Sequence, residues 1–321
     1  MIALSVRSER FPVRIDAAWG SLREREVLVV RLDLPDGTWG EGEAAPLEPY
    51  DGVSIAAVWS ALDAYAAVLR GLEPTADLLA ACAAERNLPQ ALAAIDLALW
   101  DHASRRTGRP LALLIDPRAV GSVPVNATIG AEDRAGASAA AAAAARAGFR
   151  CVKVKVGIGD DAGRVAAVRA AVGPEVGIRI DANGAWETPD LALANLRVLA
   201  PAGIELCEEP VHGVAALRAV RAGSDVPIAM DETHAPGSGA ADAVCLKVTR
   251  GGVSGVLRDA RAARAAGSDV YVASTFDGPR GLAAAVHVAA ALRVTRACGL
   301  ATGTLPVRDG VIDVPVTPGL A

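Results

Sequence analysis

The sequence predicts an α/β protein in which a (β/α) barrel follows an α+β module. Three observations support this prediction. Short apolar runs alternate with helical patterns from about residue 119 to 300, the residues before them show a hairpin and then helical periodicity, and the C-terminal tail is rich in Pro, Gly and Val. We therefore expect an α+β domain at residues 1–118, a barrel at 119–300 and a return of residues 301–321 onto the first domain.

The first domain opens with two strand-like segments, residues 26–34 and 38–43. The Pro-Asp-Gly sequence at 35–37 supplies the turn that joins them into a hairpin. Gly108 is a typical helix stop just past the last of the helical segments that follow. These segments carry apolar residues at helical spacing, and they are residues 54–69, 76–84 and 89–106.

The barrel prediction depends on eight apolar runs that are separated by Ala-rich helical segments. The almost pure alanine stretch at 137–145 resembles low complexity. Alanine is the best helix former, however, and Gly148 stops the pattern before the next run, so we assign the stretch to a barrel helix. The expected strands are residues 123–128, 151–156, 176–180, 204–207, 227–230, 243–246, 269–273 and 295–298.

Composition and charge narrow the class of protein. The chain has 321 residues, 52% of them apolar, and a net charge of −5 without a basic run, which argues against a nucleic-acid partner. Arginines stand where a signal peptide needs an apolar core, and no segment has the roughly 18 apolar residues of a membrane span. We expect a cytoplasmic protein without a membrane partner. The five cysteines are odd in number and lack CxxC spacing, so neither a disulfide framework nor a zinc site is expected.

Only three of the 32 Lys and Arg residues are lysines, namely Lys153, Lys155 and Lys247. Arginine stays protonated in proteins, whereas burial or a neighbouring cation allows lysine to become a neutral amine. A compositional bias toward Ala and Arg explains why lysine is rare, but it does not explain why the three lysines lie near prominent carboxylates. We therefore expect lysine where the chemistry requires it.

Counting the strands brings these lysines together with three acids. Barrel active sites form at the carboxyl ends of the strands, so polar residues that follow successive strands should meet there. Lys155 and Lys247 belong to the second and sixth strands, and they should face each other across a ring of eight. The residues that end or follow strands two to six are Lys155, Asp181, Glu208, Asp231 and Lys247.

The three acids predict a metal site. Clustered carboxylates repel one another and need a cation. Oxygen ligands without His or Cys favour Mg²⁺, with Mn²⁺ as a substitute, and leave coordination positions for water or a carboxylate substrate. A lone Asp at a strand end is more often a helix cap or a surface ion pair, but three at successive strand ends weaken that alternative. Glu209 and Glu232 rank below the ligands beside them because strand alternation turns their side chains away, or toward a supporting role.

Lys153 and Lys155 lie on one face of their strand, about 7 Å apart. Their mutual repulsion and a nearby metal ion both favour a neutral amine, so Lys155 is the expected general base. Lys153, one layer deeper, is expected to tune Lys155 or to neutralise an acid. Arg179 shares a face with Asp181, where it either helps to bind an anion or forms a structural ion pair.

Five motifs that occur in order resemble the muconate-lactonizing subgroup of the enolase superfamily. They are KVKVG at 153–157, DANGAW at 181–186, CEEP at 207–210, MDET at 230–233 and LKVTRGG at 246–252. The first domain resembles the capping domain of that family, and IDLALWD at 95–101 resembles its bridging helix. The resemblance implies an enolase-type modified barrel, with metal ligands at Asp181, Glu208 and Asp231 and catalytic lysines at Lys155 and Lys247.

The resemblance also implies a reaction. Lys155 would remove the proton α to a metal-bound carboxylate, and a charged Lys247 would stabilise the resulting anion from the opposite side. Within the subgroup, the short length and the segments at 39–51 and 297–303 resemble enzymes of menaquinone biosynthesis that dehydrate a succinyl-substituted hydroxycyclohexadiene carboxylate. The sequence STFDG at 274–278 departs from the consecutive serines of many relatives, which leaves the substrate open.

Further substrate contacts follow from the same resemblance. A loop at residues 17–21 would close over the site, although Trp19 in this loop can equally be a core residue. A small-molecule carboxylate is the expected partner. The residues expected to contact it or to support the site are Asn183, Ser274, Thr275, Gly299 and Trp19.

Two other classes of function remain open. N-acylamino acid racemases, dipeptide epimerases and muconate-type cycloisomerases would use the same lysines and metal on other substrates. A dipeptide epimerase should carry paired aspartates after the eighth strand, and the ACGLATG segment at 297–303 has none. A barrel that has lost catalysis and serves as a binding module would have little reason to keep both lysines and all three acids.

Overall fold

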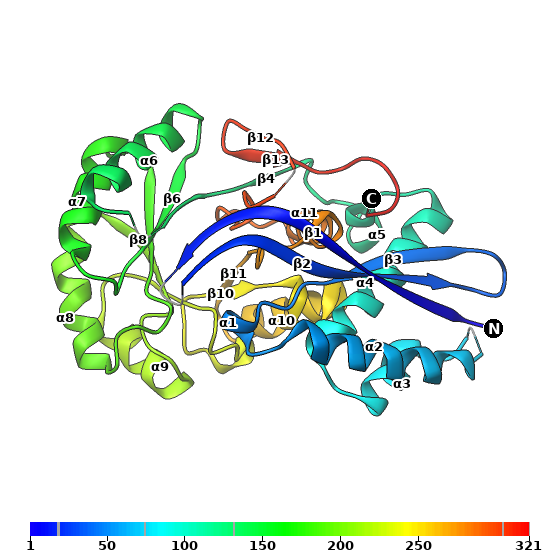
Figure 1. The fold of residues 1–321 in the computed structure, drawn as a ribbon. Coiled ribbons are helices and arrows are strands. Elements are labelled where there is room, and N and C mark those ends of the chain that lie inside the picture. The colour runs from blue at the N-terminus through cyan, green and yellow to red at the C-terminus, as the bar shows by residue number, and fades with distance from the viewer. Residues whose placement is uncertain (18–19, 74, 131, 304, 321) are drawn as a thin grey trace.

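The computed structural model describes residues 1–17, 20–73, 75–130, 132–303 and 305–320. The chain begins with a three-stranded antiparallel sheet in the order β1-β2-β3, whose long hairpin extends toward the barrel (Figure 1). The predicted hairpin is confirmed as β2 and β3, whereas β1 was not predicted because its polar residues break a simple apolar alternation. The strands are β1 (Ala3–Ala17), β2 (Gly20–Asp33) and β3 (Trp39–Ala44).

The predicted helices of this region are confirmed within two residues of their bounds, and two short helices were not predicted. Ser54 and Asp77 cap α2 and α3 by accepting from backbone N–H groups of the first turn. Gly40 and Gly42 of β3 allow α4 to lie directly on the strand, because a Cβ at either position would collide with the α4 backbone. The helices are α1 (Glu48–Asp51), α2 (Ile55–Arg70), α3 (Leu78–Glu85), α4 (Pro89–Thr107) and α5 (Leu111–Ile115).

The second part of the chain is a curled parallel sheet of seven strands in the order β11-β10-β9-β8-β7-β6-β5, with helices on its outer side (Figure 1). The predicted enolase-type α/β fold is confirmed. The strands are β5 (Ala127–Ile129), β6 (Cys151–Lys155), β7 (Gly177–Asp181), β8 (Ile204–Glu208), β9 (Ile228–Met230), β10 (Ala243–Leu246) and β11 (Asp269–Val272). The helices are α6 (Arg134–Arg146), α7 (Asp161–Val172), α8 (Pro189–Leu199), α9 (Val214–Gly223), α10 (Gly252–Ala265) and α11 (Pro279–Ala291), with 3-10 turns η1 (Ala200–Ala202), η2 (Pro236–Ser238) and η3 (Val248–Arg250).

The expected eighth barrel strand, residues 295–298, does not form a strand. The end of this run instead connects the two edges of the sheet through the single parallel pairs Val125 with Cys298 and Ala273 with Gly299. Arg296 turns its side chain toward carboxylates on β8 and β11. Only the last residues of the run therefore lie along their neighbours, which is enough to close the ring.

The segment predicted as the first barrel strand divides into two strands. Only β5 joins the barrel, whereas β4 (Ser122–Pro124) pairs with β13 (Val311–Asp313), which also pairs with β12 (Val307–Arg308). Near the end of the chain, the N–H groups of Gly319 and Leu320 donate to Ser104 and Asp101 of α4. The tail thus contacts the beginning of the barrel as well as α4. The domain limits at residues 118 and 300 stay a prediction.

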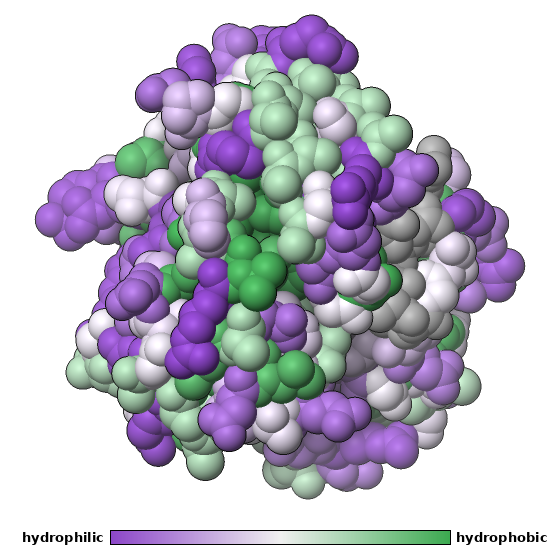
Figure 2. Space-filling view, turned by 90° about the vertical axis from the view of Figure 1, so that its left-hand side faces the viewer, coloured by the Kyte–Doolittle hydropathy of each residue, from purple (hydrophilic) through white to green (hydrophobic). Residues whose placement is uncertain are grey.

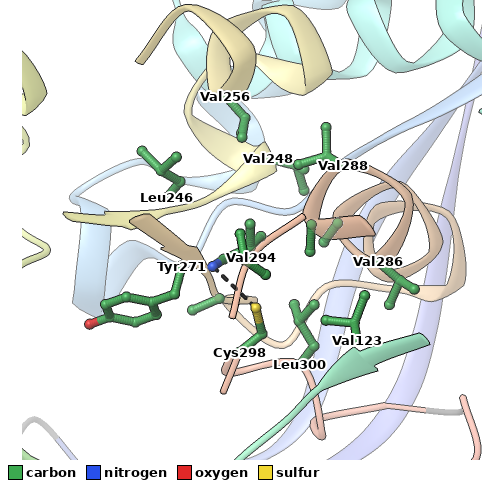
Figure 3. Close-up of a cluster of buried hydrophobic side chains, with 14 of the residues drawn as sticks. Val123, Leu246, Val248, Val256, Tyr271, Val286, Val288, Val294, Cys298 and Leu300 are labelled. Carbon is green, nitrogen blue, oxygen red and sulfur yellow. Dashed lines mark hydrogen bonds between the residues drawn. The ribbon is translucent and has the colours of Figure 1, made fainter. Parts of the chain in front are cut away.

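A buried apolar cluster separates the barrel closure from the outer helices. Figure 3 shows Leu246 of β10 pointing toward Val256 of α10, while the ring of Tyr271 points away from the valines of the cluster. The Cys298 sulfur accepts a hydrogen bond from the backbone N–H of Val272 at 3.4 Å. Strand alternation therefore sends the neighbours of Leu246 and the ring of Tyr271 into the barrel.

The outer surface of the barrel helices is mixed in character. Figure 2 shows a group of apolar side chains near the middle of this face, bordered by hydrophilic ones. Leu191 and Val198 of α8 are among the exposed large apolar residues. Among the described residues, no helix is both long and apolar enough to cross a membrane.

Candidate active site

The carboxyl ends of neighbouring barrel strands carry the candidate catalytic residues. Lys155, Asp181 and Glu208 are the last residues of β6, β7 and β8, while Asp231 and Lys247 directly follow β9 and β10. The ladder pairs Lys155 with Asp181 and Asp181 with Glu208, so these strand ends lie in register. Because β7, β8 and β9 lie between β6 and β10, the acids stand between the two lysines.

The two lysines of β6 contact different acids. Lys153 Nζ lies 2.8 Å from Asp181 Oδ2 and 2.7 Å from Glu208 Oε1, so it bridges two of the three carboxylates. Lys155 Nζ donates to Asp181 Oδ2 at 2.6 Å and to Asn183 Oδ1 at 2.7 Å. The strand period places both side chains on one face. Of the two roles expected for Lys153, its position fits the neutralisation of an acid.

Asp231 lies at the centre of a second charged group. Lys247 Nζ donates to both of its carboxylate oxygens, and Arg250 Nη1 lies 3.2 Å from its Oδ1. The Tyr50 hydroxyl donates to Asp231 Oδ2 at 3.0 Å, and it accepts from Lys247 Nζ at 2.7 Å and from Arg250 Nη2 at 2.6 Å. Since Tyr50 belongs to α1, the front of the chain contributes directly to this group.

Burial and charge act against each other in the site. Burial lowers the pKa of Lys247, but Asp231 and the other nearby acidic groups together outweigh this effect, so the pKa lies above its ordinary value. The same balance with Asp181 and Glu208 holds the pKa of Lys153 well above its ordinary value. Burial raises the pKa of Asp181 and of Asp231, yet the adjacent lysines, joined at Asp231 by Arg250, bring both below the ordinary range. Burial raises the pKa of Glu208, and the nearby Asp181 and Asp231 raise it further. Lys153 lowers this pKa, but not enough to cancel the other effects.

The three predicted ligands carry the donor atoms that a hard divalent ion prefers. Asp181 and Glu208 are each 1% exposed and Asp231 is 3% exposed, and their carboxylates offer only oxygen atoms. The ammonium of Lys153 already lies between Asp181 and Glu208, so the cluster stabilises positive charge at that place. Ligand atoms of Glu208, Asp231 and Cys245 lie within 4.8 Å of one another, whereas Asp181 is not part of this group. The assignment of the metal ligands stays a prediction.

Glu209 and Glu232 support the loops around the predicted ligands. Glu209 is buried, and its backbone φ of 39° lies in the left-handed region. Its carboxylate accepts from the backbone N–H of Asp231 at 2.8 Å and of Thr233 at 2.9 Å. It therefore holds the loop that carries Asp231. Glu232 accepts from Asn183 Nδ2 at 2.8 Å. Burial, together with the nearby Asp231, raises the pKa of Glu232 to about 8.

Sequence reasoning missed three residues of the site. Tyr50 lies in the segment at 39–51, but no periodicity distinguishes it from a packing residue. The Tyr271 hydroxyl donates to Glu208 Oε2 at 2.7 Å, although an aromatic residue in the apolar run DVYV normally indicates core packing. Arg250 was detectable only as the third residue after Lys247 in the motif LKVTRGG.

The residues predicted to contact the substrate near β11 already make hydrogen bonds within the protein. The Thr275 hydroxyl donates to Asp277 Oδ1 at 2.7 Å, and the Gly299 N–H donates to a β11 carbonyl as part of the barrel closure. The Ser274 hydroxyl accepts from the Asp277 N–H at 2.9 Å, and it also interacts with the Asp277 carboxylate. Trp19 lies outside the described residues. Substrate binding by these residues stays a prediction.

Arg179 lies deep in the barrel and is 2% exposed. Its Nη2 lies 2.9 Å from Glu205 Oε1, and its Nη1 donates to the Ala297 carbonyl at 2.5 Å. The guanidinium carbon is 5.1 Å from the centre of the Tyr271 ring. Of the two alternatives, this position fits the structural ion pair, because the side chain connects β7 with β8 and with the closing segment.

The curled barrel, its cap and the acids and lysines at the strand ends define an enzyme of the enolase superfamily. Residues 136–321 match the model described as enolase C-terminal domain-like, and residues 1–116 match the N-terminal domain of mandelate racemase / muconate lactonizing enzyme. The chain therefore belongs to the mandelate racemase and muconate lactonizing enzyme family of this superfamily.

Relatives with different activities resemble the chain, and they include synthases and epimerases. The o-succinylbenzoate synthase of Thermobifida fusca is 41% identical over 212 residues, which cover 61% of this chain and 64% of that protein, less than two thirds of its length. The L-Ala-D/L-Glu epimerase of Bacillus subtilis is 29% identical over 334 aligned residues, which cover 92% and 88%. The structure of the dipeptide epimerase of Enterococcus faecalis with Mg and the dipeptide L-Leu-L-Tyr has a TM-score of 0.90 at 26% identity, and the match covers 99% of this chain and 98% of that one.

Proposed function

We propose that the protein is an o-succinylbenzoate synthase, a lyase that removes water from 2-succinyl-6-hydroxy-2,4-cyclohexadiene-1-carboxylate in menaquinone biosynthesis. The observation that carries this choice is the 41% identity to the Thermobifida fusca synthase, compared with 29% to the Bacillus subtilis epimerase. Since the synthase alignment covers 61% of the chain, the chemistry has to be argued from the site itself.

Lys155 is the proposed base. A neutral amine can donate its two N–H groups to Asp181 and Asn183 and still present its lone pair to the substrate. The lone pair would take the proton α to the ring carboxylate, and the C–H electrons would move into that carboxylate. The ammonium formed would then protonate the departing hydroxyl as its C–O bond breaks. Water leaves from the same face, and the ring becomes aromatic.

Lys247 is proposed to stabilise the anion from the opposite side. Its raised pKa keeps it charged beside Asp231, and the hydroxyl of Tyr50 fixes the position of its Nζ. Mg²⁺ bound to Asp181, Glu208 and Asp231 would supply positive charge to the substrate carboxylate, and Mn²⁺ is an expected substitute.

The far end of the substrate favours a synthase over a dipeptide epimerase. This end is a carboxylate in the synthase substrate, whereas a dipeptide carries an ammonium group that needs an acidic partner. The segment at 297–303 contains no acidic residue. Asp277, the nearby acid after β11, is buried, and its carboxylate already interacts with the hydroxyls of Thr275 and Ser274.

The direct test is conversion of the cyclohexadiene to o-succinylbenzoate by the purified protein with Mg²⁺, followed by ultraviolet absorbance. We expect turnover by the wild-type protein and none by Lys155→Arg, which controls for contaminating activity. The protein could instead exchange the α proton of other carboxylates with solvent deuterium and form no o-succinylbenzoate. This result would reject the synthase assignment but would leave the proton-abstraction chemistry of the superfamily in place.

A racemase or epimerase is the second candidate, and a muconate-type cycloisomerase belongs to the same group. Its support is coverage, because the alignment with the Bacillus subtilis epimerase spans 92% of the chain. Proton removal and return at one α carbon would use the same two lysines on opposite faces. A higher kcat/KM for N-succinylamino acids or dipeptides than for the cyclohexadiene would favour this alternative.

A further inference from the structure

Cys245 places a sulfur atom beside two of the proposed metal ligands. Its sulfur and one carboxylate oxygen each of Glu208 and Asp231 lie within 4.8 Å of one another, and all three side chains are buried. Within the described part of the chain, the thiol of Cys245 makes no hydrogen bond, although the residue is 0% exposed. A buried donor atom without a partner beside two carboxylates is an arrangement that a cation can satisfy.

The pleat of β10 determines this position. Leu246 points outward to Val256 of α10 (Figure 3), so Cys245 and Lys247 on either side of it face the barrel interior. Both cysteines belong to buried apolar clusters. Cys207 lies on β8 directly before Glu208, so strand alternation turns its side chain to the face opposite that carboxylate. The two cysteines are equally buried and differ in the face of the sheet that they occupy.

We propose that Cys245 gives the site a second mode of metal binding, in which a thiophilic divalent ion such as Cd²⁺ or Zn²⁺ takes Cys245, Glu208 and Asp231 as ligands. The inference rests on the proposed function for the carboxylates and goes beyond it in the choice of ion. Sulfur selects thiophilic ions, whereas Mg²⁺ remains with oxygen. The thiol releases its proton to solvent as the bond between sulfur and metal forms.

The two modes of binding exclude each other. Lys153 pairs with Glu208 and Lys247 pairs with Asp231, so any divalent ion has to displace these ammonium groups from the carboxylates. With the Cys245 thiolate, Glu208 and Asp231 as ligands, three negative charges again offset the repulsion between the ion and the two lysines. Since both ions need Glu208 and Asp231, a thiophilic ion is expected to compete with Mg²⁺ and to inhibit turnover.

Cd²⁺ titration of the metal-free protein tests this inference without an activity measurement, because a Cd–thiolate bond produces a charge-transfer absorption in the ultraviolet. We expect the absorption to saturate at one ion per chain in the wild type and in Cys207→Ala, the matched control. It should disappear in Cys245→Ser, and the affinity for Cd²⁺ should fall by about 10–100-fold or more, since even partners outside the ligand set cost that much. Excess Mg²⁺ should suppress the absorption.

Two results would overturn the inference: a wild-type protein without the absorption, or a signal that persists in folded Cys245→Ser. Cys245→Ala is the second variant if the serine destabilises the barrel. If neither variant folds, the wild-type protein still tests the inference. A Cd²⁺ absorption that excess Mg²⁺ leaves unchanged would show that the two ions do not share Glu208 and Asp231. Calorimetry with Mg²⁺ alone tests the proposed function separately. Failure of Mg²⁺ to bind would reject the Mg²⁺ site, whereas a Cd²⁺ signal that depends on Cys245 would still stand.

Discussion

The barrel and the front of the chain contribute to the site in different ways. From β6 to β10, the groups proposed for proton transfer stand at successive strand ends, and their order in space follows their order in the sequence. The front of the chain, in contrast, reaches the barrel through single side chains. Arg25 and Glu43 contact the loop after β11, and Tyr50 contacts Asp231 after β9. The register of the barrel strands therefore positions the proposed catalytic residues. The packing of the front of the chain against the barrel positions the side chains that surround them.

Arg25 illustrates this docking. The residue is 3% exposed, and its guanidinium donates to the Pro46 carbonyl at 2.7 Å, the Ala45 carbonyl at 3.0 Å and the Thr275 carbonyl at 3.2 Å. One side chain of β2 thus connects the segment that leads to Tyr50 with the loop after β11. We expect substitutions in the barrel to stop the chemistry and substitutions in the docking group to change binding and stability.

The largest effect is expected for Lys155→Arg. Arginine keeps a positive charge and cannot act as a base at neutral pH, so turnover should fall by at least about 10²–10⁴-fold, the usual contribution of general acid–base catalysis. Solvent deuterium exchange should be lost in parallel. Circular dichroism and Mg²⁺ calorimetry should show an unchanged fold and metal affinity. Near wild-type turnover would refute the assignment of the base.

A smaller effect is expected for Tyr50→Phe, which removes the hydroxyl that contacts Asp231 and Lys247. Hydrogen bonds to charged groups contribute about 1.5–3 kcal/mol, so kcat should fall by about tenfold or more while KM changes less. Tyr65→Phe is the matched control, because the Tyr65 hydroxyl donates to a carbonyl within the front module. Equal losses of kcat in both variants would mean that Tyr50 acts only through stability.

For Arg25→Met, we expect KM to rise more than kcat falls, because the loop after β11 loses its connection to the front sheet. The free energy of unfolding should decrease by about 1–3 kcal/mol, since buried carbonyl partners are left unsatisfied. Arg10→Met is the control, because Arg10 is 61% exposed and pairs with acids at the surface. Urea unfolding and steady-state kinetics measure both quantities. A change in kcat alone would contradict the docking role.

The smallest effect on turnover is expected for Glu43→Gln, which should change the pH dependence of stability. Burial, together with the nearby Asp277, raises the pKa of Glu43 to about 7 from 4.5. Because the folded state favours the protonated form, the stabilisation is present below about pH 4.5 and is lost as the pH rises to about 7.

Glutamine stays neutral and keeps an oxygen that accepts the Gly278 N–H. The variant should therefore equal the wild type at pH 4 and should be more stable above pH 7, by up to about 3 kcal/mol. Chemical denaturation at a series of pH values gives the difference. A constant difference across this range would show that Glu43 does not titrate in the folded protein.

Parts of the fold and site could be predicted because they depend on local pattern. The apolar runs and helix caps predicted the barrel strands and helices, and the strand count predicted that Lys155, Asp181 and Glu208 would share one end of the sheet. The prediction of a strand at 295–298 was wrong. Arg296 forms ion pairs with Glu205 and Asp269, and the run does not continue a strand ladder.

The sequence by itself determined the period of the barrel, because alternation and spacing act within one strand or one β/α unit. Only the tertiary structure decided that Tyr50 reaches Lys247 across 197 residues and that Tyr271 reaches Glu208. These contacts depend on how the front helices and the far strand pack against the barrel. Packing sums many weak contacts between distant segments, and no short stretch of sequence carries that information.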